Sequence, residues 1–228
     1  MTRQIIERPS SNHDARAPGD AINMLTLHYT GMRSGAEALD RLCNPESRVS
    51  AHYLVEEDGA LYLLVDEESR AWHAGVSYWA GDTDINGCSI GIEIVNPGHE
   101  FGYRAFPQAQ MAAVIELCLD IQSRHVISPA RVLAHSDVAP DRKQDPGELF
   151  DWRRLADEGV GVWPYAPGDG ENPDESLARS LLAGIGYNPD ATLPVLLTAF
   201  QRHFRPALVG GALDKETFAR LRARAAIS

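Results

Sequence analysis

The sequence predicts an α/β protein with a central mixed β-sheet flanked by helices, followed by a small C-terminal three-helix domain. Three observations support this fold class. Strand-like segments with alternating apolar and polar residues are interleaved with helical segments up to residue 162. Residues 163–176 are rich in proline, glycine and acids and lack hydrophobic periodicity, which is typical of a linker. Three short helical patterns follow this linker.

Strands are predicted where apolar and polar residues alternate or where a short apolar run occurs. In chain order they lie at 21–30, 49–55, 60–65, 89–96 and 131–134. Asp58-Gly59, between the second and third of them, is a strong hairpin signal. The polar residues up to about Gly19 are expected to form an irregular arm. Residues 70–87 are expected to form a loop whose many glycines, acids and aromatics are more typical of a binding surface.

Helices are predicted where apolar residues recur at helical spacing. In chain order they lie at 34–43, 107–122, 177–185, 194–204 and 214–222. The pattern at 107–122 is the clearest, and Pro107 suits its first turn. Its apolar stripe is typical of a protein core and not of a cofactor site. We therefore expect a catalytic domain at 1–162, a linker at 163–176 and a helical domain with a thin core at 177–228.

The composition argues against several classes of partner. The chain has 228 residues, of which 44% are hydrophobic and 23% charged, as in ordinary globular proteins. Its net charge of −11, without a basic stripe, argues against nucleic-acid binding. No apolar run approaches the roughly 18–20 residues that a membrane span needs.

The cysteines and the first residues bear on location. Cys43, Cys88 and Cys118 are far apart and odd in number, which indicates reduced thiols. Residues 1–10 show neither the apolar core of a signal peptide nor a lipid-attachment cysteine. We therefore expect a cytoplasmic protein. A periplasmic or cell-envelope location is the alternative if a leader has been removed.

A group of polar residues is expected at the ends of neighbouring strands. His28 lies near the end of the first strand and Glu93 on the polar side of a later one. The loop after the last strand carries His135, Lys143 and Asp145. Two neutral imidazoles and a carboxylate, with a fourth position open to water, are a common ligand set of catalytic zinc. His28, His135 and Asp145 can supply this set.

These residues also have plainer explanations. A single strand histidine is more often structural than a ligand, Glu93 can belong to a partly exposed face, and loop lysines are usually solvated. If Glu93 faces the metal, it can take a proton from water and pass it to a leaving amine. Lys143 could then lie beside the oxygen that gains negative charge. The chain has no His-Glu-x-x-His helix, and no nucleophile-elbow motif supports a serine triad at Ser136 and Asp137.

Four motifs together resemble the zinc-dependent N-acetylmuramoyl-L-alanine amidases, a family that includes phage lysozyme-type amidases and peptidoglycan recognition proteins. In order, these are SAHYLV at 50–55, RAWHAGVS at 70–77, Asn86 with SIGIE at 89–93, and HSDVAPDRKQDPG at 135–147. The resemblance covers residues 20–155. It implies a mixed sheet flanked by helices and one zinc ion bound by His28, His135 and Asp145. It also implies hydrolysis of the amide that joins the muramic-acid lactyl group to L-alanine.

The resemblance implies roles for further residues of the site. Glu93 matches the family's general base, and Lys143 matches its oxyanion stabiliser. Trp72, His73 and Asn86 fall in segments that form the family's substrate cleft. The C-terminal part resembles the helical peptidoglycan-binding domains often fused to such amidases. We expect a monomer, and dimerisation through this C-terminal part is the alternative.

The resemblance leaves the natural substrate open, and two alternative functions besides. The two-domain layout resembles the outer-membrane lipoprotein amidase of Gram-negative bacteria, although no leader or lipid cysteine is recognisable here. The cytoplasmic relative that cleaves anhydro-muropeptides in cell-wall recycling shares the motifs but typically lacks the tail. We expect anhydro-muropeptides to be the substrate, and polymeric peptidoglycan is the first alternative. A non-catalytic recognition module and a zinc peptidase that cuts within the stem peptide are the others.

Overall fold

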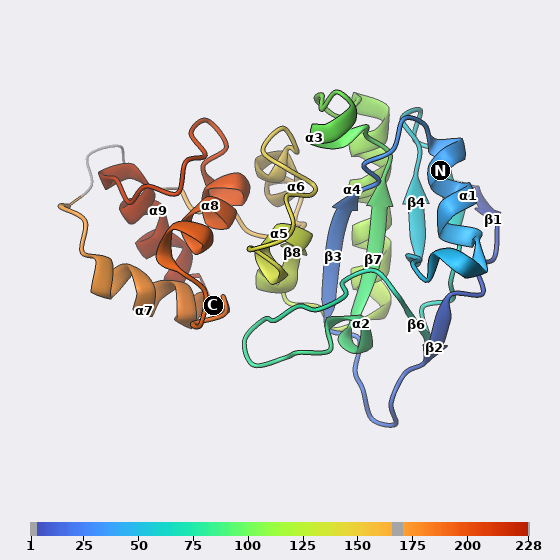
Figure 1. Cartoon of the computed structure of the whole chain (residues 1–228), viewed down its shortest axis with the longest axis horizontal. Helices are drawn as coiled ribbons and strands as arrows, with labels where there is room; N and C mark the ends of the chain where they lie inside the picture. The colour runs from blue at the N-terminus through green and yellow to red at the C-terminus, as the bar shows by residue number, and fades with distance from the viewer. Residues whose placement is uncertain (1–3, 166–170, 228) are drawn as a thin grey trace.

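The centre of the protein is a six-stranded mixed sheet (Figure 1). The computed structural model describes residues 4–165 and 171–227. The strand order is β1-β5-β4-β7-β3-β8; β4 and β5 pair antiparallel, and the other neighbours pair parallel. The strands are β1 (Ile5–Glu7), β3 (Met24–Tyr29), β4 (Tyr53–Val55), β5 (Leu61–Leu63), β7 (Ser89–Ile94) and β8 (Val132–Ala134). This sheet confirms the predicted α/β class.

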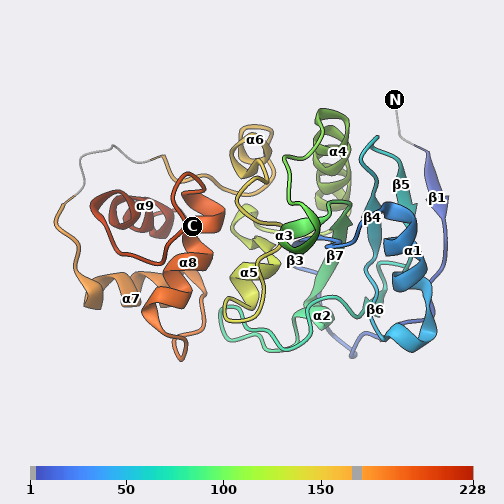
Figure 2. The same cartoon turned by 45° about the horizontal axis from the view of Figure 1, so that its top comes forward.

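Helices flank both faces of the sheet, as predicted (Figure 1, Figure 2). Val55 belongs to the apolar cluster that contains α4, whereas its neighbour Leu54 belongs to the cluster that contains α1. Because successive strand residues point to opposite faces, α4 and α1 lie on opposite sides. The helices are α1 (Gly35–Cys43), α2 (Ile85–Cys88), α3 (Gly98–Phe101), α4 (Gln108–Arg124), α5 (His135–Val138), α6 (Trp152–Asp157), α7 (Glu175–Ile185), α8 (Leu193–Phe204) and α9 (Lys215–Ala225). No described helix is both long enough and apolar enough to cross a membrane.

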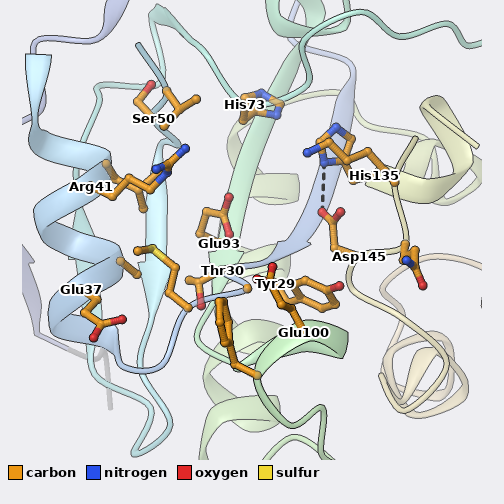
Figure 3. A pocket seen from close by; sticks show the side chains of 18 of the residues that line it. Tyr29, Thr30, Glu37, Arg41, Ser50, His73, Glu93, Glu100, His135 and Asp145 are labelled. Carbon is orange, nitrogen blue, oxygen red and sulfur yellow. Dashed lines mark hydrogen bonds and ion pairs between the residues drawn. The ribbon is translucent and has the colours of Figure 1, made fainter. Parts of the chain in front are cut away.

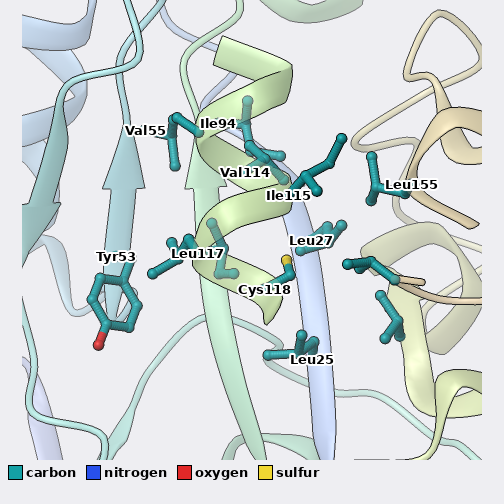
Figure 4. Packing of buried hydrophobic residues seen from close by; sticks show 14 of the residues in the cluster. Leu25, Leu27, Tyr53, Val55, Ile94, Val114, Ile115, Leu117, Cys118 and Leu155 are labelled. Carbon is teal, nitrogen blue, oxygen red and sulfur yellow. The ribbon is translucent and has the colours of Figure 1, made fainter. Parts of the chain in front are cut away.

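Helix α4 supplies one side of the main core (Figure 4). Its buried stripe is the one that the sequence predicts, made of Met111, Val114, Ile115, Cys118 and Ile121. These side chains share a buried cluster with Leu25 and Leu27 of β3 and Ile94 of β7. Burial of an apolar side chain of this size contributes about 1.5–3 kcal/mol. The stripe is therefore core, as predicted.

The α1 helix and the β4–β5 hairpin also follow the predicted pattern. Ser34 caps α1 because its hydroxyl oxygen accepts a hydrogen bond from the backbone N–H of Glu37 at 3.2 Å. The helix ends at Cys43 with Asn44 as its C-cap, before a 3-10 turn at Pro45–Ser47. Gly59 has a φ of 87°, which glycine adopts without strain, and this allows the turn between the two strands.

The prediction of an irregular arm up to Gly19 is wrong for two short segments. Strand β1 pairs in parallel with β5 at the edge of the sheet. Strand β2 (His13–Ala15) pairs antiparallel with β6 (Ser69–Ala71) in a separate two-stranded sheet. All residues of β1 and β2 are exposed, so no alternation of buried and exposed positions marks them in the sequence. The predicted loop at 70–87 likewise contains the start of helix α2 at Ile85.

The C-terminal helices α7, α8 and α9 pack against β8 and α5 through buried apolar side chains. Leu182, Leu197 and Phe200 share one buried apolar cluster with Leu133 of β8 and Val138 of α5. Part of the predicted linker, residues 166–170, lies outside the described residues. The apolar core of α7, α8 and α9 is thus continuous with side chains of the sheet layer.

Asp137 of α5 is a buried carboxylate that connects the part of the chain that forms the sheet with the C-terminal helices. Its Oδ2 atom accepts hydrogen bonds from the backbone N–H of Ala134 at 2.8 Å and from Nδ1 of His203 at 2.6 Å. Its Oδ1 atom accepts one from the hydroxyl of Tyr187 at 2.6 Å. The His203 ring stacks on Trp152 with ring centroids 3.8 Å apart. Helix α5, which begins at residue 135, is therefore fixed by side chains of the C-terminal part.

The hydroxyl of Tyr187 should contribute measurably to stability. Tyr187→Phe leaves Oδ1 of the buried Asp137 without its partner, and we expect the free energy of unfolding to fall by about 1–3 kcal/mol. Urea unfolding measures this change. Tyr165→Phe is the matched control, because Tyr165 is 63% exposed and bonds to an exposed Asp157. That control should stay within about 0.5 kcal/mol of the parent. Equal stability of the Tyr187→Phe variant would contradict the role assigned to this bond.

Candidate metal centre

Strand pairing brings three distant parts of the chain together. In the parallel pair of β3 and β7, His28 lies opposite Glu93. In the parallel pair of β3 and β8, Leu27 lies opposite Ala134, so that His135 follows directly beside His28. All three strands end at the same edge of the sheet, which is where open α/β sheets bind ligands.

His28, His135 and Asp145 form a buried triangle of ligand atoms. Nδ1 of His28 lies 2.9 Å from Nδ1 of His135 and 3.1 Å from Oδ2 of Asp145. Nδ1 of His135 lies 3.0 Å from the same carboxylate oxygen, along the dashed line in Figure 3. Such separations are close to those in a tetrahedral metal site with bonds of about 2.0–2.2 Å. These are the three residues that the sequence predicts as metal ligands.

The hydrogen bonds around His135 show that the triangle suits a cation. Nε2 of His135 lies 3.1 Å from the carbonyl oxygen of Ala74, which can only accept a hydrogen bond. Nε2 therefore donates a hydrogen bond, and Nδ1 faces the carboxylate of Asp145. A ring nitrogen and a carboxylate oxygen only 3.0 Å apart need a positive charge beside them, which a proton or a metal ion supplies. A divalent ion meets this requirement.

The charge states within the triangle also favour a metal. Burial, together with the nearby His135, lowers the pKa of His28 to about 4, so that this ring is neutral at pH 7. Burial alone would raise the pKa of Asp145, but the charges and hydrogen bonds of His135 and His28 hold it well below its usual range. The donor set thus includes an ionised carboxylate and the neutral ring of His28, which are protonation states that metal ligands need.

Glu93 faces the same space as the triangle (Figure 3). Burial raises the pKa of its carboxyl well above the usual value; the charge of Asp145 adds to this, and that of Lys143 opposes it. Its Oε2 atom is buried and has no hydrogen-bond partner among the described residues. An unpaired carboxyl with a raised proton affinity, beside a cation site, is suited to proton transfer.

His135 and Asp145 of the triangle line a cleft of about 640 Å³. Lys143 also lines this cleft, and the described residues hold no ion-pair partner for its ammonium group. Its positive charge contributes to the lowered pKa of His28, which places it near the metal centre. The cleft thus brings together two of the predicted ligands, the predicted base Glu93 and the ammonium group of Lys143.

The three residues predicted for the substrate cleft differ in their position. Trp72 and His73 line the cleft. Asn86 is buried instead, and its Oδ1 atom accepts hydrogen bonds from the backbone N–H groups of His73 at 3.1 Å and Ala74 at 2.8 Å. It therefore shapes the loop that carries His73. Contact of Trp72, His73 or Asn86 with a substrate remains a prediction.

Three arginines of the cleft, Arg33, Arg41 and Arg142, were not singled out by the sequence. Arg142 donates hydrogen bonds to the carbonyl oxygens of Ala74 and Val76. These bonds connect the segment at 135–147, called the ligand loop because it carries His135 and Asp145, to the loop at 70–87. Arg41 of α1 lines the cleft on the side away from the metal centre (Figure 3). Arg142 lies within the 135–147 motif, which is a signal that could have identified it. Nothing in the sequence distinguishes Arg41 from an ordinary arginine of an exposed helix face.

Comparison with known proteins identifies the family of the chain. The sequence model of the family described as N-acetylmuramoyl-L-alanine amidase matches residues 18–148. The chain belongs to this amidase family. The predicted family, fold class and enzyme class are therefore confirmed. The metal centre lies within the matched segment, since His28, His135 and Asp145 all fall between its ends.

Relatives of the chain include amidases of two kinds. N-acetylmuramoyl-L-alanine amidase AmiD of Escherichia coli is 38% identical and is matched over 93% of this chain and 87% of its own. 1,6-Anhydro-N-acetylmuramyl-L-alanine amidase AmpD of Haemophilus influenzae is 39% identical over 64% of this chain and 86% of its own. Both names describe the hydrolysis of a muramyl-L-alanine amide.

Solved structures give the same result for the fold. AmiD of E. coli, in complex with anhydro-N-acetylmuramic acid-L-Ala-D-γ-Glu-L-Lys, superposes with a TM-score of 0.81 over 91% of each chain at 38% identity. AmpDh3 of Pseudomonas aeruginosa superposes with a TM-score of 0.81 at 33% identity, over 93% of this chain and 95% of its own. The likeness thus extends over the C-terminal helices as well as the sheet.

The buried histidines predict acid sensitivity of the metal-depleted protein. The pKa values of His28 and His52 fall to about 4 and about 3 in the folded state, against 6.5 for a free side chain, and that of His73 is also lowered. Between about pH 6.5 and pH 4 these histidines are therefore protonated in the unfolded chain but stay neutral in the folded chain. We expect the free energy of unfolding to hold above about pH 6.5 and to fall toward pH 4, by about 1.4 kcal/mol per pH unit for each proton.

Urea unfolding between pH 4 and pH 8 checks this expectation. The raised pKa of Glu93 acts in the opposite sense, because the folded state gains stability when this carboxyl is protonated. A Glu93→Gln variant removes that opposing titration and should show a steeper fall. A free energy of unfolding that stays constant from pH 7 to pH 4 in both proteins would contradict the burial of neutral rings.

Proposed function

We propose that this amidase uses one zinc ion and acts on soluble anhydro-muropeptides of cell-wall recycling. It would hydrolyse the amide between the lactyl group of the muramic or anhydro-muramic acid and L-alanine. The observation that carries this proposal is the triangle of His28, His135 and Asp145 beside the unpaired carboxyl of Glu93 in one cleft. The substrate is supported by the anhydro-muropeptide bound to AmiD of E. coli and by the name of the AmpD relatives.

In this proposal the zinc ion is held by the two imidazoles and the carboxylate of the triangle. Nitrogen ligands with one carboxylate are a common set for catalytic zinc. When bound, the zinc ion supplies Lewis acidity that acts on a carbonyl oxygen and on water. His135 and Asp145 lie on one short loop, whereas His28 comes from the central strand β3.

Glu93 and Lys143 would carry the remaining steps. Glu93 takes a proton from water while the water oxygen bonds to the carbonyl carbon of the lactyl group. The ammonium group of Lys143 lies beside the carbonyl oxygen and stabilises the negative charge that develops there. Glu93 then gives its proton to the nitrogen of L-alanine, and the bond between this nitrogen and the carbonyl carbon breaks. The products are the free lactyl carboxylate and a peptide with a free amino end.

The rest of the chain would support this chemistry as follows. We propose a catalytic domain at 1–162, a linker at 163–176 and a helical, peptidoglycan-binding-like domain at 177–228. We also propose that the protein acts as a monomer. The described cysteines are free, which supports a cytoplasmic location.

Polymeric peptidoglycan is a second candidate substrate with one observation in its favour. A groove of about 440 Å³ runs between the ligand loop and α8, lined by Arg142 and Lys143 on one side and by Thr198 and Arg202 on the other. Arg142 and Lys143 also line the main cleft. A longer glycan strand could therefore extend from the cleft along the C-terminal helices.

The role of Glu93 can be tested with a conservative variant. Glu93→Gln should keep one zinc per chain but lose turnover of a muramyl-peptide by about 10²–10⁴-fold, because the amide cannot transfer the proton. His28→Ala should instead lose zinc. Metal analysis and product formation followed by mass spectrometry measure both. The matched control is Glu100→Gln, which changes another carboxyl that lines the cleft, on α3. Full turnover of the Glu93→Gln variant would refute the assignment of the base.

The choice of substrate is tested by direct competition. The purified protein is offered intact sacculi and anhydro-muramyl-tripeptide, and the initial rates are compared. We expect faster release of a peptide with an N-terminal L-alanine from the soluble compound. A faster reaction on sacculi would favour the polymeric substrate. Products cut within the stem peptide would indicate a peptidase.

A further inference from the structure

We infer that His73 and Ser89 are positioning residues, which hold the zinc ligand His28 in the tautomer that presents Nδ1 to the metal. This inference rests on the proposed metal site and adds a hydrogen-bond chain behind it. His73 is only 9% exposed, and both of its ring nitrogens contact side chains of the protein. These contacts leave it no nitrogen free for a substrate.

The chain of hydrogen bonds begins at a backbone carbonyl. The hydroxyl of Ser89 donates to the carbonyl oxygen of Ile85 at 2.5 Å, so its only proton is used there. The same oxygen lies 3.2 Å from Nε2 of His73 and can only accept from it. Nε2 of His73 therefore carries the ring proton.

The direction of the next bonds follows from this assignment. The ring of His73 is buried and contacts no carboxylate among the described residues, and an imidazole with its proton on Nε2 has a lone pair on Nδ1. This Nδ1 lies 3.1 Å from Nε2 of His28, which must then donate. With its proton on Nε2, His28 presents the lone pair of Nδ1 to the triangle with His135 and Asp145.

Strand β7 is built to hold this arrangement. Ser89, Gly91 and Glu93 alternate along one face of the strand, and the ring of His73 lies over Gly91. A Cβ atom at Gly91 would come within 2.4 Å of Cγ of His73, so only glycine leaves room for the ring. The backbone of His73 is fixed in addition by Asn86. One strand face thus carries the anchor of the chain, the space for its middle member and the predicted base.

The second histidine ligand, His135, also donates through Nε2, so that both His28 and His135 turn Nδ1 toward the metal site. Nε2 of His135 donates to the carbonyl oxygen of Ala74, the residue that follows His73. The loop at residues 73–74 therefore fixes the tautomers of both histidine ligands, one through a side chain and one through a carbonyl oxygen. Partners of this kind orient metal-bound histidines and raise metal affinity.

Four variants of the full-length zinc protein test the inference. His73→Phe keeps the volume of the ring over Gly91 but removes both hydrogen bonds, and Ser89→Ala removes the acceptor of the Nε2 proton. We expect the dissociation constant for zinc, measured by competition with a chelator, to rise by about 10–100-fold in both variants. His73→Asn should restore most of the affinity, because its Oδ1 atom takes the place of the accepting Nδ1.

Thr26→Val is the matched control. Thr26 is a buried residue of β3 whose hydroxyl has no hydrogen-bond partner among the described residues, so removal of this hydroxyl should leave zinc affinity unchanged. Proton–nitrogen spectra of the histidine rings give a second readout. They should show His28 with its proton on Nε2 in the parent protein and a mixture of tautomers in metal-depleted Ser89→Ala. This second readout also decides the question if His73→Phe fails to fold.

The outcomes separate this inference from the proposed function. Unchanged zinc affinity in both Ser89→Ala and His73→Phe, with normal zinc binding by the parent protein, would overturn the inference alone. A rise in KM for a muropeptide with unchanged zinc affinity would also overturn it, and would make His73 a substrate contact. A parent protein that neither binds zinc nor cleaves a muropeptide would refute the proposed function itself.

Discussion

Parallel pairing of β3 with both β7 and β8 is the constraint on which the site depends. The register of these pairs places His28 beside Glu93 on one side and beside the start of α5 on the other. Residues that are about a hundred positions apart in the sequence therefore meet without any long loop reaching across the protein. The helices on the two faces bury the apolar side chains of the same strands, so the core and the site are fixed by one set of pairings.

The site concentrates groups that a core normally excludes. Asp145 and several neutral imidazoles are buried at one edge of the sheet, and Glu93 has a buried oxygen without a partner. In the absence of a cation this arrangement opposes folding, because burial disfavours charged and unpaired groups. A divalent ion bound by His28, His135 and Asp145 would reverse this effect, so its binding would be coupled to folding. The hydrogen bonds from Ser89 through His73 to His28 join neutral groups, so this chain needs no charged partner.

The sequence predicts much of this structure for physical reasons that can be traced to single residues. The α4 stripe and the β3 and β7 strands are visible because one face of each is buried, and periodicity reports burial. Strands β1 and β2 are exposed throughout and leave no such trace. His28 and His135 can be recognised as a candidate ligand pair from their types and positions. The tautomer chain cannot, because it depends on the contact of His73 with Ser89 across a loop.

The link between Asp137 and the C-terminal helices constrains how this protein can evolve. A gene that lost the segment from α7 onward would expose Leu133 and Val138 and would leave the carboxylate of Asp137 without Tyr187 and His203. A shortened descendant would therefore need compensating polar substitutions on β8 and α5, directly beside His135. Sequence divergence at these positions should accompany any change in the length of the chain, whereas the ligands themselves can stay the same.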